Sequence, residues 1–191
     1  SDFYGSDVPI TLYLTVPFGQ IDRVAPVVKL LIDFILRRFS SGELRAGQKD
    51  NTLKIPILFL LDEFSSLGKM EFVSRSMGIL GGLGMRFYII VQMYTQILEL
   101  YGQHNTFMAN CRYKIIYAPQ EQSDCEMFSK MMGKESVRND NMSVSGSRYA
   151  VALNNLNVSS QEVARDLMNP DELAKLPYTD CIVMAEGMPP Y

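Results

Sequence analysis

Two adjacent carboxylates, Asp62 and Glu63, directly follow an apolar run at residues 55–61. Such a run predicts a central parallel strand that is covered on both faces, and ligands of open α/β sheets bind at the carboxyl ends of strands. An aspartate there can hold Mg²⁺ that bridges nucleotide phosphates, and a neighbouring glutamate can deprotonate the attacking water. The pair therefore indicates a nucleotide site, although two such acids would equally suit the start of a loop and the cap of the next helix.

A second predicted strand, residues 85–91, is followed directly by Gln92. If this strand lies beside the first one, Gln92 falls next to Asp62. An amide at that position can sense the γ-phosphate or orient the attacking water, as a glutamine does in GTPases. The alternative is that Gln92 only caps the end of the strand.

Arg86 begins the same strand, after the sequence Gly-Gly-Leu-Gly. At the usual rise per residue it lies about 20 Å from Gln92, so we do not expect it to reach the site of its own chain. In a ring it could instead be offered to the site of a neighbouring subunit. A surface ion pair with an acid such as Glu71 is the alternative for Arg86, and Arg165 is a rival for the catalytic arginine.

A phosphate-binding loop of the form GxxxxGK(S/T) does not occur in these 191 residues. Gly81-Gly82-Leu83-Gly84 precedes a strand, whereas a phosphate loop follows a strand and opens a helix. Without a loop that cradles the phosphates, we expect the 191 residues alone neither to bind ATP tightly nor to hydrolyse it. A hydrolytic triad is not supported either, because His104 is the single histidine and no Gly-x-Ser-x-Gly accompanies it.

Apolar periodicity predicts short strands alternating with helices along most of the chain. The expected strands are residues 10–16, 55–61, 85–91, 113–117 and 182–185, and the expected helices are residues 24–38, 68–80, 93–101, 105–110 and 122–132. Residues 40–51 are expected to form a surface loop, and residues 139–157 a β-hairpin or an irregular excursion. This alternation implies an α/β layer with a mainly parallel sheet.

The composition is that of a globular domain, with 47% hydrophobic residues, 20% charged residues and a formal net charge of −3. A free-standing basic nucleic-acid module is therefore not indicated. The basic residues within 130–148 suit either contact with nucleic-acid phosphates or a solvated hairpin. Three widely spaced cysteines predict reduced cytosolic thiols and no zinc site. The longest apolar run is too short to cross a bilayer, so we expect a soluble piece.

Several short segments together resemble the hexameric DNA-pumping ATPases called type IV coupling proteins, of the TraG/TraD type. They are Leu61-Asp62-Glu63-Phe64 with Leu67-Gly68-Lys69, Gly84-Met85-Arg86, Val91-Gln92, Gln96-Ile97 through Tyr101-Gly102, Asn110-Cys111, Tyr117-Ala118-Pro119, Gly133-Lys134, Leu167-Met168-Asn169-Pro170-Asp171-Glu172-Leu173 and Gly187-Met188-Pro189-Pro190. Each segment alone is a weak signal. Their order and spacing across the whole chain are specific.

The resemblance implies a RecA-like P-loop NTPase fold, of which residues 1–191 are the C-terminal portion without the phosphate loop. Asp62 would be the Walker B aspartate on Mg²⁺, Glu63 the catalytic glutamate and Gln92 the phosphate-sensing residue. The parent would be an ATP- and Mg²⁺-dependent homohexamer at the cytoplasmic face of the bacterial inner membrane, anchored by helices upstream of Ser1. It would deliver relaxase–DNA complexes or effector proteins to the channel of a type IV secretion system.

Two other functions remain open from the sequence. A related DNA translocase of the FtsK or HerA kind would use the same ATPase chemistry, but the segments around Asn169 and Gly187 favour the coupling proteins. A non-catalytic adaptor would share the fold and bind secretion substrates. Two adjacent strand-end acids argue against an adaptor, because binding alone does not need them.

Overall fold

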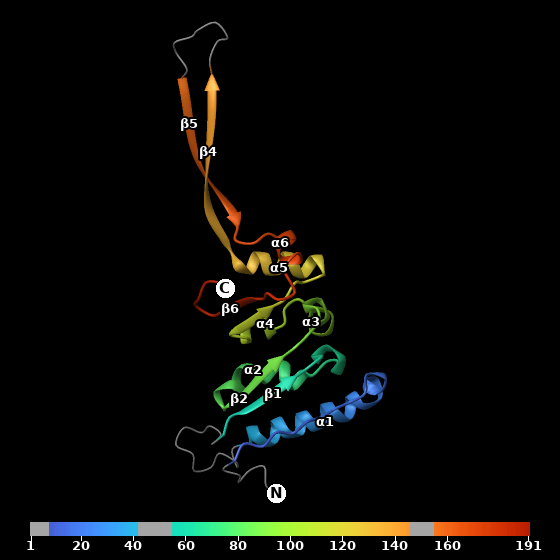
Figure 1. The fold of residues 1–191 in the computed structure, drawn as a ribbon. Coiled ribbons are helices and arrows are strands. Elements are labelled where there is room, and N and C mark those ends of the chain that lie inside the picture. The colour runs from blue at the N-terminus through green and yellow to red at the C-terminus, as the bar shows by residue number, and fades with distance from the viewer. Residues whose placement is uncertain (1–7, 42–54, 146–154) are drawn as a thin grey trace. The chain divides into compact units, whose positions relative to one another are not determined.

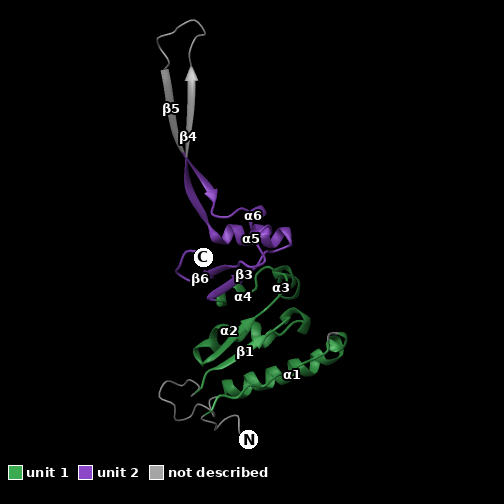
Figure 2. Ribbon diagram, viewed as in Figure 1, with its two compact units in different colours: residues 1–111 green, residues 112–191 purple. Residues whose placement is uncertain are grey.

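The computed structural model describes residues 8–41, 55–145 and 155–191 (Figure 1). The chain divides into two compact units, residues 1–111 and residues 112–191 (Figure 2). No helix among the described residues combines the length and the apolar character that a membrane crossing requires.

Unit 1 is built around a parallel pair of strands joined by a helix. Its elements are η1 (Phe18–Gln20), α1 (Ile21–Ser40), β1 (Ile57–Leu61), η3 (Phe64–Leu67), α2 (Glu71–Gly82), β2 (Met85–Ile89), α3 (Tyr94–Tyr101) and α4 (Phe107–Asn110). The register of β1 and β2 runs from Ile57 opposite Met85 to Leu61 opposite Ile89. Since the strands are parallel, both end at the same edge of the sheet. This arrangement places Gln92 near Asp62, as the sequence predicted for adjacent strands.

The core of unit 1 lies where α2 packs on β2 and where α1 packs on η3 and α2. Helix α2 buries residues at helical spacing, Val73, Met77 and Leu80, and packs on β2, where Met85 is fully buried. Helix α1 buries Ala25, Ile32 and Leu36. The guanidinium of Arg37 lies 4.4 Å from the centroid of the Phe72 ring, and this cation–π contact joins α1 to α2.

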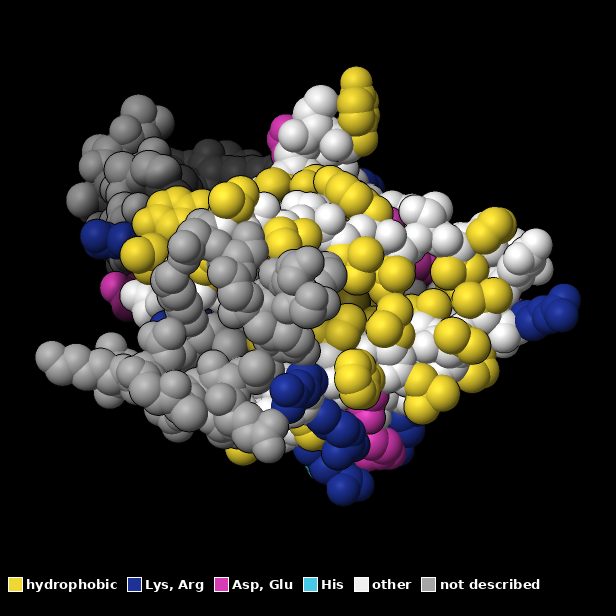
Figure 3. All heavy atoms as spheres, turned by 90° about the horizontal axis from the view of Figure 1, so that it is seen from below, with side chains coloured by type: hydrophobic (Ala, Val, Ile, Leu, Met, Phe, Trp, Pro, Cys, Tyr) yellow, Lys and Arg dark blue, Asp and Glu magenta, His cyan; other side chains and the backbone are white. Residues whose placement is uncertain are grey.

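Several apolar residues of unit 1 stay exposed within the described part of the chain. On β1 the side chains of Leu58 and Leu60 are 61% and 60% exposed. The apolar run predicted that both faces of this strand are covered, but one face is exposed within the described residues. Helix α1 carries a second apolar stripe at helical spacing, formed by Val27, Leu30, Leu31 and Phe34, all exposed. The face of the molecule drawn in Figure 3 shows many such hydrophobic side chains, with basic residues along its margin. Exposed apolar patches of this kind mark surfaces that pack against other protein.

Unit 2 contains two antiparallel strand pairs. Its elements are β3 (Tyr113–Ile116), α5 (Gln122–Met132), β4 (Lys134–Ser145), β5 (Asn155–Asp166), α6 (Pro170–Ala174) and β6 (Ile182–Ala185). Strand β3 pairs with β6, from Tyr113 opposite Ala185 to Ile116 opposite Ile182. Strands β4 and β5 form a long hairpin from Lys134 opposite Asp166 to Ser145 opposite Asn155.

The base of this hairpin is tied to the helices of unit 2. The Ser129 hydroxyl on α5 donates a hydrogen bond to the Met168 carbonyl at 2.6 Å, and Leu173 on α6 is fully buried. Asn169 and Glu172 form a reciprocal capping box at the start of α6, with the Asn169 N–H donating to Glu172 Oε2 at 2.8 Å. Such a box satisfies backbone donors that a helix N-terminus would leave unpaired.

Most predicted elements of the chain are confirmed, and the hairpin expected at residues 139–157 is found to run from Lys134 to Asp166. Its residues 146–154 lie outside the described residues, as do residues 42–51 of the expected loop. The strand predicted at residues 10–16 is wrong, because these largely exposed residues have no hydrogen-bonded neighbouring strand in the described chain. Helix α6 was not predicted. Among the described residues, the pair of β1 with β2 is parallel, whereas the two strand pairs of unit 2 are antiparallel.

Candidate functional site

The candidate site lies at the carboxyl ends of β1 and β2, where Asp62 and Glu63 leave one strand and Gln92 follows the other. Backbone hydrogen bonds continue past the last paired residues: the Ile90 N–H donates to the Leu61 carbonyl, and the Phe64 N–H donates to the Ile90 carbonyl, both at 3.0 Å. These bonds hold the two strand-end segments together. The Asp62 side chain is exposed at this edge, and that of Glu63 is half-buried.

The structure brings Glu63 and Gln92 into direct contact. The side-chain amide of Gln92 donates from Nε2 to Glu63 Oε2 at 3.1 Å. Asp62 accepts a hydrogen bond at its Oδ1 from the Glu63 N–H, at 3.0 Å, so one of its carboxylate oxygens is engaged by the local backbone. The three residues predicted for the site, which follow the ends of two adjacent strands, are thus neighbours in space.

Glu63 adopts an unusual backbone conformation. Its φ of 50° and ψ of 44° are left-handed, and it is the only non-glycine residue with a positive φ among the described residues. A side chain in this region costs about 1–3 kcal/mol and persists only where the surroundings impose it. Such outliers cluster at functional sites, which supports a functional role for this glutamate. Nothing in the sequence signals this conformation.

The surroundings that impose it begin with Phe64, the next residue, which is completely buried. Its ring stacks with Tyr101 at a centroid distance of 6.2 Å and contacts Phe107 at 5.6 Å, while Tyr101 and Phe107 meet edge to face at 4.7 Å. The turn after Glu63 is closed by the Ser66 N–H, which donates to the Glu63 carbonyl at 2.9 Å. Glu63 therefore lies between the end of β1 and the buried ring of Phe64, and both restrict its backbone.

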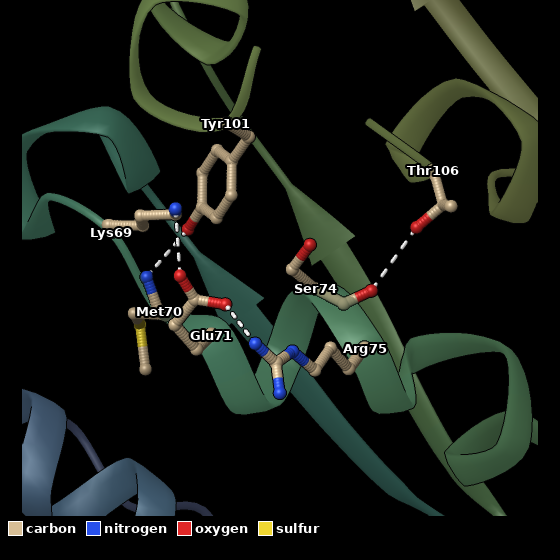
Figure 4. A network of polar contacts seen from close by, with 7 residues as sticks. All are labelled: Lys69, Met70, Glu71, Ser74, Arg75, Tyr101 and Thr106. Atoms are coloured by element: carbon tan, nitrogen blue, oxygen red, sulfur yellow. Dashed lines mark hydrogen bonds and ion pairs between the residues drawn. The ribbon is translucent and has the colours of Figure 1, made fainter. Parts of the chain in front are cut away.

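Tyr101 also makes a polar contact at the start of α2. Its hydroxyl accepts a hydrogen bond from the Met70 N–H at 2.8 Å, as Figure 4 shows. Burial raises the pKa of Tyr101, so the phenol stays protonated at neutral pH. The hydroxyl thereby serves as an acceptor for a backbone donor near the helix N-terminus. The segment from Glu63 to α2 is fixed at both of its ends by contacts with α3.

Glu71, the acid considered as a partner for Arg86, is occupied by two other cations (Figure 4). Lys69 Nζ lies 2.7 Å from its Oε1, and an Arg75 guanidinium nitrogen lies 3.2 Å from its Oε2. The hydrogen bond from Lys69 lowers the pKa of Glu71, with a smaller contribution from Arg75. The ion pair between Arg86 and Glu71 that the sequence allowed is therefore not formed.

Arg86 is exposed on β2 and lies opposite Leu58 in the register, toward the strand end remote from Gln92. Within the described part of the chain, its guanidinium makes no ion pair or hydrogen bond. Arg165, the rival candidate, lies on β5 in unit 2 and donates to Glu172 Oε1 at 2.6 Å, so it is engaged in an ion pair. Of the two candidate arginines, Arg165 is thus the one that is held in an ion pair within the described residues.

Of the basic residues at 130–148, Lys130 lies on α5, and Lys134 and Arg138 lie on β4, the first strand of the hairpin in unit 2. Lys134, at the base of β4, lies 3.6 Å from the Asp166 carboxylate. Arg148 lies outside the described residues. Contact of this segment with nucleic acid stays a prediction.

The donor set at the strand ends fits a magnesium–nucleotide complex in part. Asp62 offers a carboxylate oxygen in addition to the one that accepts the Glu63 N–H, and Mg²⁺ prefers such oxygens. The Glu63 carboxylate with the Gln92 amide beside it suits the activation of water. A phosphate cradle of backbone amides and a lysine does not occur in the sequence, so the phosphates would need further contacts from outside these residues.

The sequence matches the family described as type IV secretory system conjugative DNA transfer, over residues 2–191. Among curated proteins it is similar to the conjugal transfer protein TraG of Escherichia coli, with 30% identity over 175 residues, or 90% of this chain and 28% of that protein. It is also similar to VirD4 of Agrobacterium fabrum, with 29% identity over 185 residues, or 94% of this chain and 26% of that protein. The chain thus spans about a quarter of the length of these relatives.

Solved structures agree on the fold. The bacterial conjugative coupling protein TrwBdeltaN70 superimposes with a TM-score of 0.68 at 19% identity, over 92% of this chain and 38% of that one. TrwB in complex with the ATP analogue ADPNP gives a TM-score of 0.65 at 18% identity, over 90% of this chain and 36% of that one. This likeness shows the RecA-like α/β fold that the sequence predicted. With a family match across nearly its whole length, the chain belongs to the type IV secretory system conjugative DNA transfer family.

Proposed function

We propose that this chain supplies the magnesium- and water-handling side of the ATPase site in a conjugative coupling protein. The observation that carries the proposal is the contact between Glu63 and Gln92 beside Asp62, at the common edge of two parallel strands. In α/β sheets this edge is where ligands bind. ATP hydrolysis would drive the delivery of relaxase–DNA complexes or effector proteins to the secretion channel.

Each of the three residues has a distinct part in this proposal. The Asp62 carboxylate would hold Mg²⁺, and bound Mg²⁺ would neutralise charge on the nucleotide phosphates. The Glu63 carboxylate would take a proton from the attacking water, and the Gln92 amide would orient that water. The phosphates would be cradled by a loop elsewhere in the longer protein, so the 191 residues alone are not expected to bind ATP tightly.

The proposed setting is a homohexamer at the cytoplasmic face of the bacterial inner membrane, attached through helices outside the 191 residues. The exposed apolar faces of α1 and β1 support packing against further protein, since parallel sheets normally have both faces covered. Among the alternatives, the match to the conjugative DNA transfer family argues against an FtsK- or HerA-like translocase. A non-catalytic adaptor is the alternative that experiment has to distinguish from the proposed ATPase.

The proposal predicts that Asp62→Asn abolishes conjugal transfer by a full-length protein that contains this sequence. The amide keeps the size of the side chain but loses the negative charge that holds Mg²⁺. The measurement is transfer frequency in a mating assay, with the deleted gene complemented by each variant. Asp22→Asn, at an exposed aspartate in the first turn of α1, is the matched control and should transfer normally. Normal transfer by Asp62→Asn would instead support the adaptor.

We further propose that Arg86 acts on the site of a neighbouring subunit, where negative charge builds on the γ-phosphate. The expected result is that Arg86→Ala and Glu63→Gln rings are each inactive, whereas mixed rings regain part of the ATPase activity. Activity returns because some interfaces then pair an intact Arg86 with an intact Glu63. The measurement is ATP turnover across mixing ratios of the full-length protein. Normal turnover by Arg86→Ala alone would exclude this role.

A further inference from the structure

A hydrogen bond between side chains joins the two segments that follow the strand ends. The Ser65 hydroxyl on η3 donates to Gln96 Oε1 on α3 at 2.8 Å, and both side chains are half-buried. The two residues are far apart in the sequence, and neither is one of the three residues proposed to meet the nucleotide. The contact therefore belongs to the support of the site and not to the site itself.

Ser65 and Gln96 lie close in sequence to the two residues whose contact defines the site. Ser65 follows Glu63 and Phe64 at the start of η3, and Gln96 lies four residues after Gln92, in the first turn of α3. The Ser65–Gln96 bond thus runs alongside the bond from Gln92 Nε2 to Glu63 Oε2. Two hydrogen bonds therefore join the segment after β1 to the segment after β2. Two such bonds restrict both the distance between the segments and the rotation of one relative to the other.

The strained backbone makes this second link important for Glu63. A left-handed glutamate returns to a more favourable conformation unless its neighbours prevent it. On the backbone, the Phe64 N–H is bonded to Ile90 and the Glu63 carbonyl to Ser66. Beyond these bonds, Ser65 is the residue of η3 whose side chain reaches across to α3 through a hydrogen bond. A loosened η3 would therefore let the Glu63 carboxylate shift relative to Gln92.

We propose that Gln96 is a positioning residue, which acts through Ser65 to hold the Glu63 carboxylate at the place where it takes a proton from water. This inference rests on the proposed ATPase function. Gln96 touches neither the nucleotide nor the water in this account. Its loss therefore lowers the rate of the chemical step and leaves nucleotide affinity in place, because a displaced catalytic group costs rate and not ground-state binding.

The test is a double-mutant cycle on the full-length protein, with Ser65→Ala, Gln96→Leu and the two combined. Each single substitution should lower kcat for ATP by roughly 10–10²-fold, as expected for a misplaced catalytic group, with KM unchanged. The double variant should be no slower than the slower single variant, since both remove the same bond. Gln96→Glu keeps an acceptor oxygen for the Ser65 hydroxyl and should restore most of kcat.

Ser66→Ala is the matched control, because it removes a hydroxyl one residue further along η3 that makes no hydrogen bond within the described residues. It should leave kcat unchanged. Additive losses in the double variant, a raised KM, or wild-type kcat for Ser65→Ala would each overturn the inference. The proposed function fails separately: it is contradicted if the wild-type protein does not hydrolyse ATP, or if Glu63→Gln turns over normally.

Discussion

Replacing Glu63 by glutamine in a full-length protein that contains this sequence should slow ATP turnover by about 10²–10⁴-fold, the usual contribution of a general base. The amide retains the shape of the side chain and its contact with Gln92, but it cannot accept the proton from water. Nucleotide affinity should change little, because Asp62 and the phosphate-binding contacts remain. Steady-state ATP hydrolysis and a nucleotide-binding titration on the same preparation measure both quantities.

Glu99→Gln provides a matched control for this substitution. Glu99 is an exposed glutamate on α3 of the same unit and is not one of the residues proposed for the site, so its replacement should leave turnover unchanged. A Glu63→Gln protein with wild-type turnover would show that another group activates the water. A protein that loses nucleotide affinity and turnover together would place Glu63 in binding and not in the chemical step.

Replacing Phe64 by alanine should destabilise unit 1 by about 3–5 kcal/mol, the usual cost of removing a buried phenylalanine ring. The Phe64 side chain is completely buried, and its ring contacts both Tyr101 and Phe107, so its loss leaves a cavity beside these two rings. Urea unfolding followed by far-ultraviolet circular dichroism measures the change in the free energy of unfolding.

Tyr178→Ala is the control for this prediction, because the Tyr178 side chain is 94% exposed and its removal should cost little. Equal free energies of unfolding for the two variants would contradict the packing of Phe64 described above. Since Phe64 immediately follows Glu63, the destabilised protein should also lose the fixed position of the glutamate. The aromatic cluster thus connects the stability of unit 1 to the geometry of the candidate site.

The site could be located from the sequence because its parts follow local patterns. The continuous apolar run before Asp62 identified a strand end, and the second run placed Gln92 at the end of the next strand. The parallel register of β1 and β2 then accounts for the meeting of the two ends. The helical spacing of apolar residues likewise located α2, α3 and α5 to within a few residues.

The features that the sequence did not reveal depend on contacts between distant residues. The Ser65–Gln96 bond and the acceptor role of the Tyr101 hydroxyl each join residues whose spacing follows no local period. The left-handed Glu63 is imposed by tertiary packing, against the preference of its residue type. The antiparallel pairing of β3 with β6 is also non-local, because apolar runs do not specify which strand lies beside which.

At residues 10–16 the sequence predicted a strand that the structure does not form. Their apolar run has the composition of a buried strand, yet Ile10, Leu12 and Leu14 are about half exposed and extend without a hydrogen-bonded neighbour among the described residues. A strand requires a partner as well as a suitable sequence. The apolar pattern therefore indicates a tendency to form a strand, but the described part of the chain provides no partner strand.

In the proposed function, Asp62, Glu63 and Gln92 form the catalytic edge of an ATPase site. The most direct measurement is a structure of the full-length protein with Mg²⁺ and a non-hydrolysable ATP analogue. We expect Mg²⁺ to lie against the Asp62 carboxylate, directly or through one water, with Glu63 and Gln92 facing the γ-phosphate. A nucleotide bound away from the carboxyl ends of β1 and β2, with none of these three side chains near its phosphates, would contradict it.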